Sequence, residues 1–459
     1  MQKNEEIILD IIDVTSEGNG IGKYEGMAVF VPLTTVGDTV RVKVLKVKKN
    51  YVYAKVMDII NASADRIESD CGVFKQCGGC VYRHINYNAE LQIKTKQVYE
   101  VIKRIGGVDL APQPILFDEN MHYRNKAQYP VNSAGEPGFY AFHSHRIIPC
   151  KDCKLQPEIF AEILSVFENW VKENRISIYN EIKHKGFLRH IYLRRAEKTG
   201  EIMVTVIING EELPFSETLC EKLKSVCGDA LKSVQININK ENTNVILGKK
   251  CKIIYGQPYI TDILCGVKVR LSPLSFYQVN RTMAEKLYMK AAEYAEPENK
   301  NIIDLYCGAG TIGLSMAKTA KSIIGVEIIP EAIEDAKFNA LQNGVKNSRF
   351  ICGDAVFAAE RLAKENIKAD VIIIDPPRKG CLPELIKTVS EKFVPERVVY
   401  ISCDPATLAR DIKLFSESGY ALKEYIPADL FPRTSHCEVV CLLIKEYKNS
   451  LKGKRNENN

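Results

Sequence analysis

The sequence has no run of about 18 or more apolar residues, which is the length that a membrane-crossing helix needs. It also has no evident internal repeat or low-complexity segment. Residues 1–6 are polar and acidic, which does not fit a secretory signal peptide. We therefore expect a cytosolic protein that has no membrane partner.

The cysteines do not indicate a disulfide framework. There are 15 of them, an odd number, in a chain of 459 residues. In a long cytosolic chain, cysteines more often serve as metal ligands or catalytic groups. The length predicts about three domains, and an apolar content of 46% is enough for each to bury a sizeable core. The net charge of +6 permits nucleic-acid binding without indicating it, so the local distribution of charge matters more.

Residues 1–60 alternate between apolar and polar positions and carry turn signals near residues 16–20 and 37–38. This pattern predicts a small β-barrel of the oligonucleotide-binding kind. Residues 41–55 contain six basic residues and no acidic residue, with Tyr51 and Tyr53 among them. Cations for phosphates and aromatic rings for bases suit single-stranded or looped RNA. The alternative is an ordinary solvated strand face.

Three closely spaced cysteines, Cys71, Cys77 and Cys80, indicate a metal site. A fourth ligand is needed for zinc or for an iron–sulfur cube. Cys150 and Cys153 are both candidates, and spacing alone does not choose between them or between the two metals.

Residues 61–270 are expected to form a mixed sheet domain that carries this metal site, with helices at 91–105 and 157–173. The basic run 185–195, together with Arg124, Lys126 and Arg146, could line an RNA surface or be a solvated sheet face. Residues 448–459 are expected to be a disordered tail.

From about residue 271 to residue 447, helices alternate with short apolar strands, which predicts a doubly wound α/β domain. A strand at 301–306 runs into the glycine-rich turn 308–313, and Glu327 follows Gly308 by 19 residues. This fingerprint alone would also suit NAD. Asp304 before the turn and Asp354 after the next strand favour S-adenosylmethionine, because they could meet its amino group and its adenine.

Two further strand ends carry reactive groups. Asp375 ends the strand at 370–374, and Cys403 follows the strand at 397–401 where a helix begins. A helix start would favour the thiolate, which is the nucleophilic form of cysteine. The alternative is that Cys403 is a small buried core residue.

A methyltransferase needs a nucleophile when the acceptor is an unreactive carbon, such as carbon 5 of uracil or cytosine. Thiolate addition at carbon 6 activates carbon 5, and a base must later remove the carbon-5 proton. Glu438, at the start of an apolar strand, is the candidate base, because its surroundings could raise its pKa. His436 is the alternative base.

With these residues in view, the C-terminal half resembles the RNA uracil-5-methyltransferase family. The matching motifs are 275–280, 304–310, 375–380, 402–405 and 436–438. The resemblance implies that Cys403 is the nucleophile and Glu438 the base. It also implies a group of residues that hold S-adenosylmethionine, namely Gln278, Tyr306, Glu327 and Asp375, with Asp354 close by.

The chain further resembles the family's ribosomal branch, which adds a TRAM barrel and a [4Fe-4S] cluster. That resemblance implies Cys71, Cys77, Cys80 and Cys153 as cluster ligands, and a helix near 91–105 that packs with the catalytic domain. Thr311 departs from some members, which carry an asparagine there.

The expected function is methylation of carbon 5 of specific 23S rRNA uridines by a monomer that flips the base out. A transfer-RNA enzyme is the alternative with the same chemistry. A non-catalytic RNA-binding or assembly factor is a further alternative, against which the presence of both Cys403 and Glu438 argues.

Overall fold

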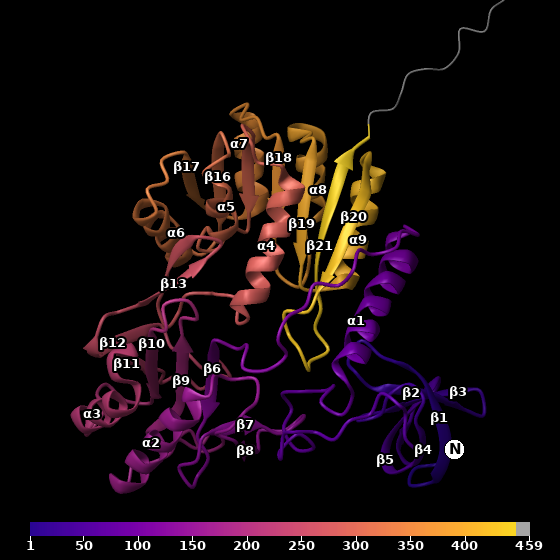
Figure 1. Cartoon of the computed structure of the whole chain (residues 1–459), viewed down its shortest axis with the longest axis vertical. Coiled ribbons are helices and arrows are strands. Elements are labelled where there is room, and N and C mark those ends of the chain that lie inside the picture. The colour runs from indigo at the N-terminus through magenta and orange to yellow at the C-terminus, as the bar shows by residue number, and fades with distance from the viewer. Residues whose placement is uncertain (447–459) are drawn as a thin grey trace, which may run out of the picture.

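The computed structural model describes residues 1–446. The barrel and the central domain lie side by side, and the catalytic domain lies across both of them (Figure 1). The segment expected to be a disordered tail, 448–459, lies outside the described residues. Within 1–446, no helix combines the length and the apolar character that crossing a membrane requires.

The first domain is a closed barrel with the strand order β1-β2-β3-β5-β4. Its core is filled by alternate residues such as Leu9, Val29 and Val42, as the period of the sequence predicts. The strands are β1 (Glu6–Val14), β2 (Gly20–Tyr24), β3 (Met27–Val31), β4 (Thr39–Val47) and β5 (Tyr51–Asn61).

Strand β2 falls partly in the segment that was expected to be only a turn. Glycine is needed there because the strands pack closely: a Cβ on Gly22 would lie 1.9 Å from Leu9 Cδ1. Glycine in a strand often marks such a close approach. Because β2 contains glycine at positions 20 and 22, its sequence pattern predicts a turn and not a strand.

The central domain is built on a five-stranded sheet with the order β12-β11-β10-β9-β6. Helices α2 and α3 cover one face, and Trp170 of α2 is fully buried there. A two-stranded β7–β8 sheet lies beside it. The elements are β6 (Lys126–Pro130), β7 (Gly138–Tyr140), β8 (Ile147–Pro149), α2 (Ile159–Glu173), β9 (Leu188–Arg195), β10 (Ile202–Ile208), α3 (Ser216–Cys227), β11 (Leu231–Ile238) and β12 (Lys250–Gly256).

Helix α1 (Tyr87–Val101) begins four residues before the expected start, since Leu91 is four positions after Tyr87. It begins there because the Asn86 side chain accepts a hydrogen bond from the Ala89 N–H at 2.8 Å and caps the first turn. A short π-helical turn, Ile102–Gly106, follows. Val98 and Ile102 belong to the same core as Leu408 of α9, so α1 packs with the catalytic domain (Figure 1).

The catalytic domain has a seven-stranded sheet with the order β17-β16-β15-β18-β19-β21-β20. The pairs from β17 to β19 are parallel, whereas β21 is antiparallel to both β19 and β20. The strands are β15 (Asn301–Leu305), β16 (Ser322–Glu327), β17 (Ser348–Cys352), β18 (Val371–Ile374), β19 (Arg397–Ser402), β20 (Tyr420–Ala428) and β21 (Glu438–Lys445).

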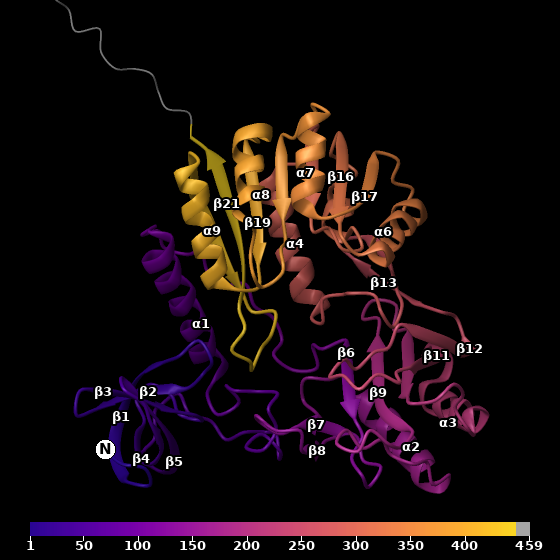
Figure 2. The same cartoon turned by 180° about the vertical axis from the view of Figure 1, so that it is seen from behind.

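Helices cover both faces of this sheet (Figures 1 and 2). They are α4 (Arg281–Ala295), α5 (Thr311–Met316), α6 (Pro330–Gln342), α7 (Ala355–Lys364), α8 (Pro383–Thr388) and α9 (Pro405–Glu417). The hairpin of β13 (Ile260–Leu264) and β14 (Val267–Leu271) shares a core with α4, so the catalytic unit begins before residue 271. The carboxyl ends of the parallel strands point toward the two other domains.

Candidate active site

A cavity of about 830 Å³ opens at the carboxyl edge of the catalytic sheet. Ligands of open α/β sheets gather at this edge because several strand ends and their loops meet there. All seven residues that the family resemblance implied for catalysis or cofactor binding line this one cavity: Gln278, Tyr306, Glu327, Asp354, Asp375, Cys403 and Glu438. Gln278 and Glu438, which are 160 positions apart in the sequence, thus line the same cavity.

Cys403 lies between β19 and α9, as expected, and is half-buried. We expected the helix start to favour its thiolate, but the surroundings of the thiol act in the opposite direction. Burial, followed by the Glu438 and Asp375 carboxylates, raises the pKa of the Cys403 thiol to about 11. The first N–H groups of α9 are already occupied, because the Asp404 side chain accepts hydrogen bonds from Ala406 N and Thr407 N.

Glu438 is 4% exposed at the start of β21. Burial, and then the Asp375 carboxylate, raise the pKa of Glu438 to about 8, which confirms the expected direction. Burial also raises the pKa of Asp375 to about 7. The site therefore holds two carboxyl groups that exchange protons near neutral pH, which suits general acid–base work.

Arg378 is the cation that balances these acids, and it lowers the pKa of both Cys403 and Glu438. Its Nη2 lies 3.4 Å from Nε2 of His436. Burial, with Arg378 next, lowers the pKa of His436, which favours the neutral imidazole as an acceptor for the guanidinium. The sequence contained a signal for Arg378, since it directly follows Asp375-Pro376-Pro377.

The other end of the cavity offers groups suited to a nucleoside. Glu327 ends β16, and its carboxylate accepts hydrogen bonds from Gly308 N at 3.2 Å and Ile329 N at 2.9 Å. Asp354 caps α7 through Oδ1, which accepts from Val356 N at 2.9 Å. Tyr306 has a φ of 65°, a left-handed conformation that is rare outside glycine and clusters at functional sites.

Gln278 is held from the central domain. Asn125 Nδ2 donates to Gln278 O at 2.8 Å, and Asn125 N donates to Val279 O at 2.8 Å. A smaller neighbouring cavity shares Gln278 and is also lined by Thr311, the position that departs from some family members. The cofactor-side wall is therefore built jointly by two domains.

Asp304 does not line the cavity, in contrast to its expected contact with a cofactor amino group. It is 1% exposed, and its Oδ2 accepts from Gly313 N at 3.0 Å. Burial raises its pKa to about 7. Asp304 thus supports the first turn of α5 from below the cavity.

Lys126 contributes to the cavity from the central domain. The sequence had placed it only on a general RNA surface. Burial, with Arg194 and Arg124 nearby, lowers its pKa to about 8. Phe276 and Phe431 add aromatic rings to the same wall. Lys126 was hard to find because it lies in a different domain from Cys403.

The cysteine-rich segment forms a second cavity of about 80 Å³. It is lined by Cys71, Cys77, Cys80 and both candidate fourth ligands, Cys150 and Cys153, with Arg83 and Arg124 beside them. A hydrogen bond from Cys150 and the nearby arginines lower the pKa of Cys153, whereas burial raises that of Cys80 to about 12.

The five cysteines of this cavity are the right residue type for a metal site, but their side chains are not arranged around a common metal position. Across residues 1–446, no group of three or more His, Cys, Asp or Glu side chains is arranged to hold a metal ion. Each of the fifteen cysteines, all within that range, is free.

Comparison with known proteins identifies both parts of the chain. Residues 86–446 match the family model described as tRNA (Uracil-5-)-methyltransferase, and residues 2–57 match the TRAM domain. The first match begins one residue before α1, which agrees with the packing of that helix on the catalytic domain.

Two bacterial relatives match along nearly their whole length. An uncharacterized RNA methyltransferase of Halalkalibacterium halodurans is 43% identical over 455 residues, covering 98% of each chain. One of Clostridium acetobutylicum is 42% identical over 451 residues, covering 96% of this chain and 98% of its own.

A solved structure has the same overall arrangement. It is the Pyrococcus abyssi tRNA (uracil-54, C5)-methyltransferase in complex with S-adenosyl-L-homocysteine. The TM-score is 0.78 at 27% identity, and the match covers 95% of this chain and 100% of that one. On the strength of the matched range and the two relatives, the chain belongs to the tRNA (Uracil-5-)-methyltransferase family.

Proposed function

We propose that this protein transfers a methyl group from S-adenosylmethionine to carbon 5 of specific uridines in RNA, and that its substrate is 23S rRNA. The observation that carries the proposal is the single cavity in which Cys403 and Glu438 share a wall with Gln278, Tyr306, Glu327, Asp354 and Asp375. That cavity is large enough for two ligands, a cofactor and a base.

The reaction begins when the Cys403 sulfur, having lost its proton, adds to carbon 6 of uracil. The π electron pair of the carbon 5–carbon 6 double bond moves toward the neighbouring carbonyl and forms an enolate at its oxygen. Carbon 5 of the enolate then takes the methyl group, whose bond to the donor sulfur breaks with the electron pair left on that sulfur. Glu438 removes the carbon-5 proton, the carbon 5–carbon 6 double bond reforms, and the Cys403 thiolate leaves.

S-adenosylmethionine, when bound, supplies the methyl group. The donor set fits it: Glu327 can accept from the ribose hydroxyls and Asp354 from the adenine amino group, because each keeps free carboxylate capacity. The Pyrococcus enzyme was solved with the demethylated form of this molecule, which agrees with the assignment.

The ionisation of Cys403 is a requirement of this scheme. With its pKa raised to about 11, the thiol is protonated at neutral pH in the free protein. Asp375 and Glu438, with pKa values near 7 and 8, are acceptors for that proton, and Arg378 favours the thiolate. We infer that proton loss accompanies base binding.

The barrel offers a surface for the rest of the RNA. Phe30, Tyr51 and Tyr53 form a ring cluster with centroids 5.4–5.9 Å apart. Tyr53 is 41% exposed, and Lys46 of β4 is its partner across the β4–β5 strand pair. Stacking rings beside cations suit single-stranded RNA of any sequence. The RNA would enter as an unpaired loop from which the target uridine is flipped out.

The choice of 23S rRNA rests on the resemblance of the cysteine motif to the ribosomal branch. We expected the barrel to favour a ribosomal substrate. It does not distinguish the two substrates, because the Pyrococcus tRNA enzyme matches 95% of this chain, and most of the barrel must lie within that match. A tRNA substrate is therefore the second candidate. We also keep the monomer and the cytosol as expectations; free cysteines suit a reducing compartment.

We further propose a [4Fe-4S] cluster held by Cys71, Cys77, Cys80 and Cys153. The support is chemical: five thiols line one cavity, and Arg83 and Arg124 can offset the negative charge of a thiolate-ligated cluster. Iron and acid-labile sulfide should be present after anaerobic purification. One zinc and no iron would refute the cluster.

Methylation assays on 23S rRNA and on tRNA transcripts test the main proposal. We expect 5-methyluridine in 23S rRNA, no product with Cys403→Ala, and a covalent RNA–protein adduct that persists with Glu438→Gln. Full activity in Cys403→Ala would rule out the covalent mechanism. If 5-methyluridine formed in tRNA alone, the substrate would be tRNA and not 23S rRNA. If neither RNA were methylated, a non-catalytic RNA-binding factor would be favoured.

A further inference from the structure

The loop between β20 and β21 connects Ala428 to Glu438. It descends from the edge of the catalytic sheet to the place where the three domains meet (Figures 1 and 2). Phe431 and His436 of this loop line the catalytic cavity, and the loop runs directly into Glu438. Strand pairing with Ala428 places the backbone of Glu438, whereas the loop that leads into it supplies the surroundings of its side chain.

Four consecutive carbonyl oxygens of this loop are held by donors from four other parts of the chain. These parts are the cap of α4, helix α1, the segment before β6, and the segment after Cys80. The bonds are Asn280 Nδ2 to Leu430 O (3.2 Å), Lys94 Nζ to Phe431 O (3.3 Å), Tyr123 OH to Pro432 O (2.9 Å), and Val81 N and Tyr82 N to Arg433 O (2.8 and 3.2 Å).

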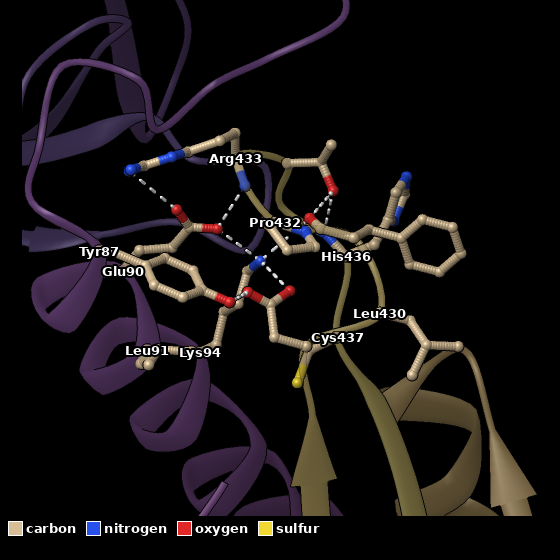
Figure 3. Close-up of polar contacts among 12 residues, drawn as sticks. Tyr87, Glu90, Leu91, Lys94, Leu430, Pro432, Arg433, His436 and Cys437 are labelled. Carbon is tan, nitrogen blue, oxygen red and sulfur yellow. Dashed lines mark hydrogen bonds and ion pairs between the residues drawn. The ribbon is translucent and has the colours of Figure 1, made fainter. Parts of the chain in front are cut away.

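A buried charge network lies behind these bonds (Figure 3). The side chain of Lys94 is 0% exposed, and its Nζ donates to Glu90 Oε1 and Asp429 Oδ1, each at 2.8 Å. Glu90 Oε1 also accepts from Arg433 N at 2.7 Å. Tyr87 OH donates to Asp429 Oδ2 at 2.9 Å. Arg433 Nη1 also lies 3.5 Å from Glu90 Oε2, so two cations meet two carboxylates where α1 packs against the loop.

Such a network is better suited to fixing a conformation than to adding stability. Burying charges costs solvation energy that their attraction only roughly offsets, so apolar residues would stabilise as well. What the charges add is direction. The Glu90 carboxylate of α1 accepts from Lys94 and from Arg433 of the loop, and the Asp429 carboxylate of the loop accepts from Lys94 and Tyr87 of α1. Arg433 has a φ of 70°, a strained conformation for a non-glycine residue that the surrounding contacts must maintain.

We propose that Lys94 and Tyr123 are positioning residues for the base: they fix the 430–433 backbone so that Glu438 and His436 face the bound uracil. This inference rests on the proposed function. It assigns to α1 and to the central domain a part in proton removal from carbon 5, rather than in cofactor binding. Loss of either residue should slow release of the covalent adduct more than its formation.

Three variants test this. Lys94→Met removes the central cation, and Tyr123→Phe removes only a hydroxyl, so it should fold even if the first does not. The matched control is Arg397→Met, because Arg397 is 14% exposed and paired with Glu296 at the far end of β19. Hydrogen exchange of the 429–438 peptide and decay of a preformed RNA adduct are measured in each.

We expect exchange in this peptide to rise about tenfold in Lys94→Met, and by a smaller factor in Tyr123→Phe, with the control unchanged. Adduct decay should slow by similar factors, while cofactor affinity stays at the wild-type value. Unchanged exchange, or wild-type decay in a variant whose loop has loosened, would overturn the inference. If the wild-type protein forms no adduct, the proposed reaction is contradicted instead. The hydrogen-exchange result then shows by itself whether Lys94 and Tyr123 hold the loop.

Discussion

Cys403 and Glu438 face each other across two hydrogen-bonded strands. Ser402 of β19 pairs with Val439 of the antiparallel β21, so Cys403 follows one member of the last pair and Glu438 precedes the other. Strand register alone therefore places a thiol beside a carboxyl group. This explains why the Glu438 carboxylate contributes, after burial, to raising the pKa of the Cys403 thiol, and why both residues line one cavity.

The rate of methylation should rise with pH. Glu438 acts as a base only when ionised, and its pKa is raised to about 8; the Cys403 thiol, raised to about 11, also has to ionise. We expect initial rates to increase about tenfold or more from pH 6 to pH 8. Arg378→Met should move the profile to higher pH, because Arg378 lowers both pKa values, whereas Arg361→Met on the exposed side of α7 should not. A flat profile would contradict this reading of the site.

Glu438→Gln should stabilise the protein, and more so at high pH. In the folded state Glu438 keeps its proton up to about pH 8, whereas its ordinary pKa is 4.5. The folded protein therefore binds more protons between these values and loses stability as pH rises through them. One pKa unit corresponds to about 1.4 kcal/mol, so the gain should reach about 2 kcal/mol or more at pH 8.5. Thermal unfolding at pH 6 and 8.5 measures it; an equal gain at both would refute the cause.

Two substitutions of Asp354 should separate its structural role from its ligand role. Asp354→Ser keeps an N-cap oxygen for Val356 N, so stability should hold, whereas Asp354→Ala should cost about 1 kcal/mol. Both remove the carboxylate proposed to meet adenine. We expect both to weaken binding of S-adenosylhomocysteine in calorimetry, and to a similar degree. If Asp354→Ser bound S-adenosylhomocysteine with wild-type affinity, the Asp354 carboxylate would not be a cofactor contact.

The fourth cluster ligand can be tested by comparing two neighbouring cysteines. Cys150 and Cys153 line the same cavity, but only Cys153 has its pKa lowered. Cys153→Ser should lose most of the iron, and Cys150→Ser should keep it, as measured by iron and sulfide content after anaerobic purification. The reverse result would make Cys150 the ligand.

Much of the reaction centre was predictable because its residues sit in local patterns. Cys403 follows an apolar strand and precedes a helix, and Glu327 and Asp375 end strands in the same way. Ends of parallel strands meet at one edge, so a local pattern was enough to bring them together. The thiol pKa was mispredicted because it depends first on burial and then on Glu438 and Asp375, neither of which is near Cys403 in sequence.

The rest required tertiary structure. Lys94 and Asp429 are 335 residues apart, and nothing in their local sequence indicates that they meet. Lys126 looked like one basic residue among several until the central sheet was placed beside the cavity. Strand β2 was missed because the packing that demands Gly22 comes from β1.

The order of strands in the catalytic sheet has a consequence for protein synthesis. Strand β21 comes last in chain order among the described strands, yet it lies between β19 and β20. Domains generally fold as units during synthesis, the N-terminal ones first. A nascent chain that ends before residue 438 lacks the strand that lies between β19 and β20, and it also lacks Glu438. We therefore expect a partly translated chain to fold the barrel, which could already hold RNA, before it has the proposed base for releasing a methylated uridine.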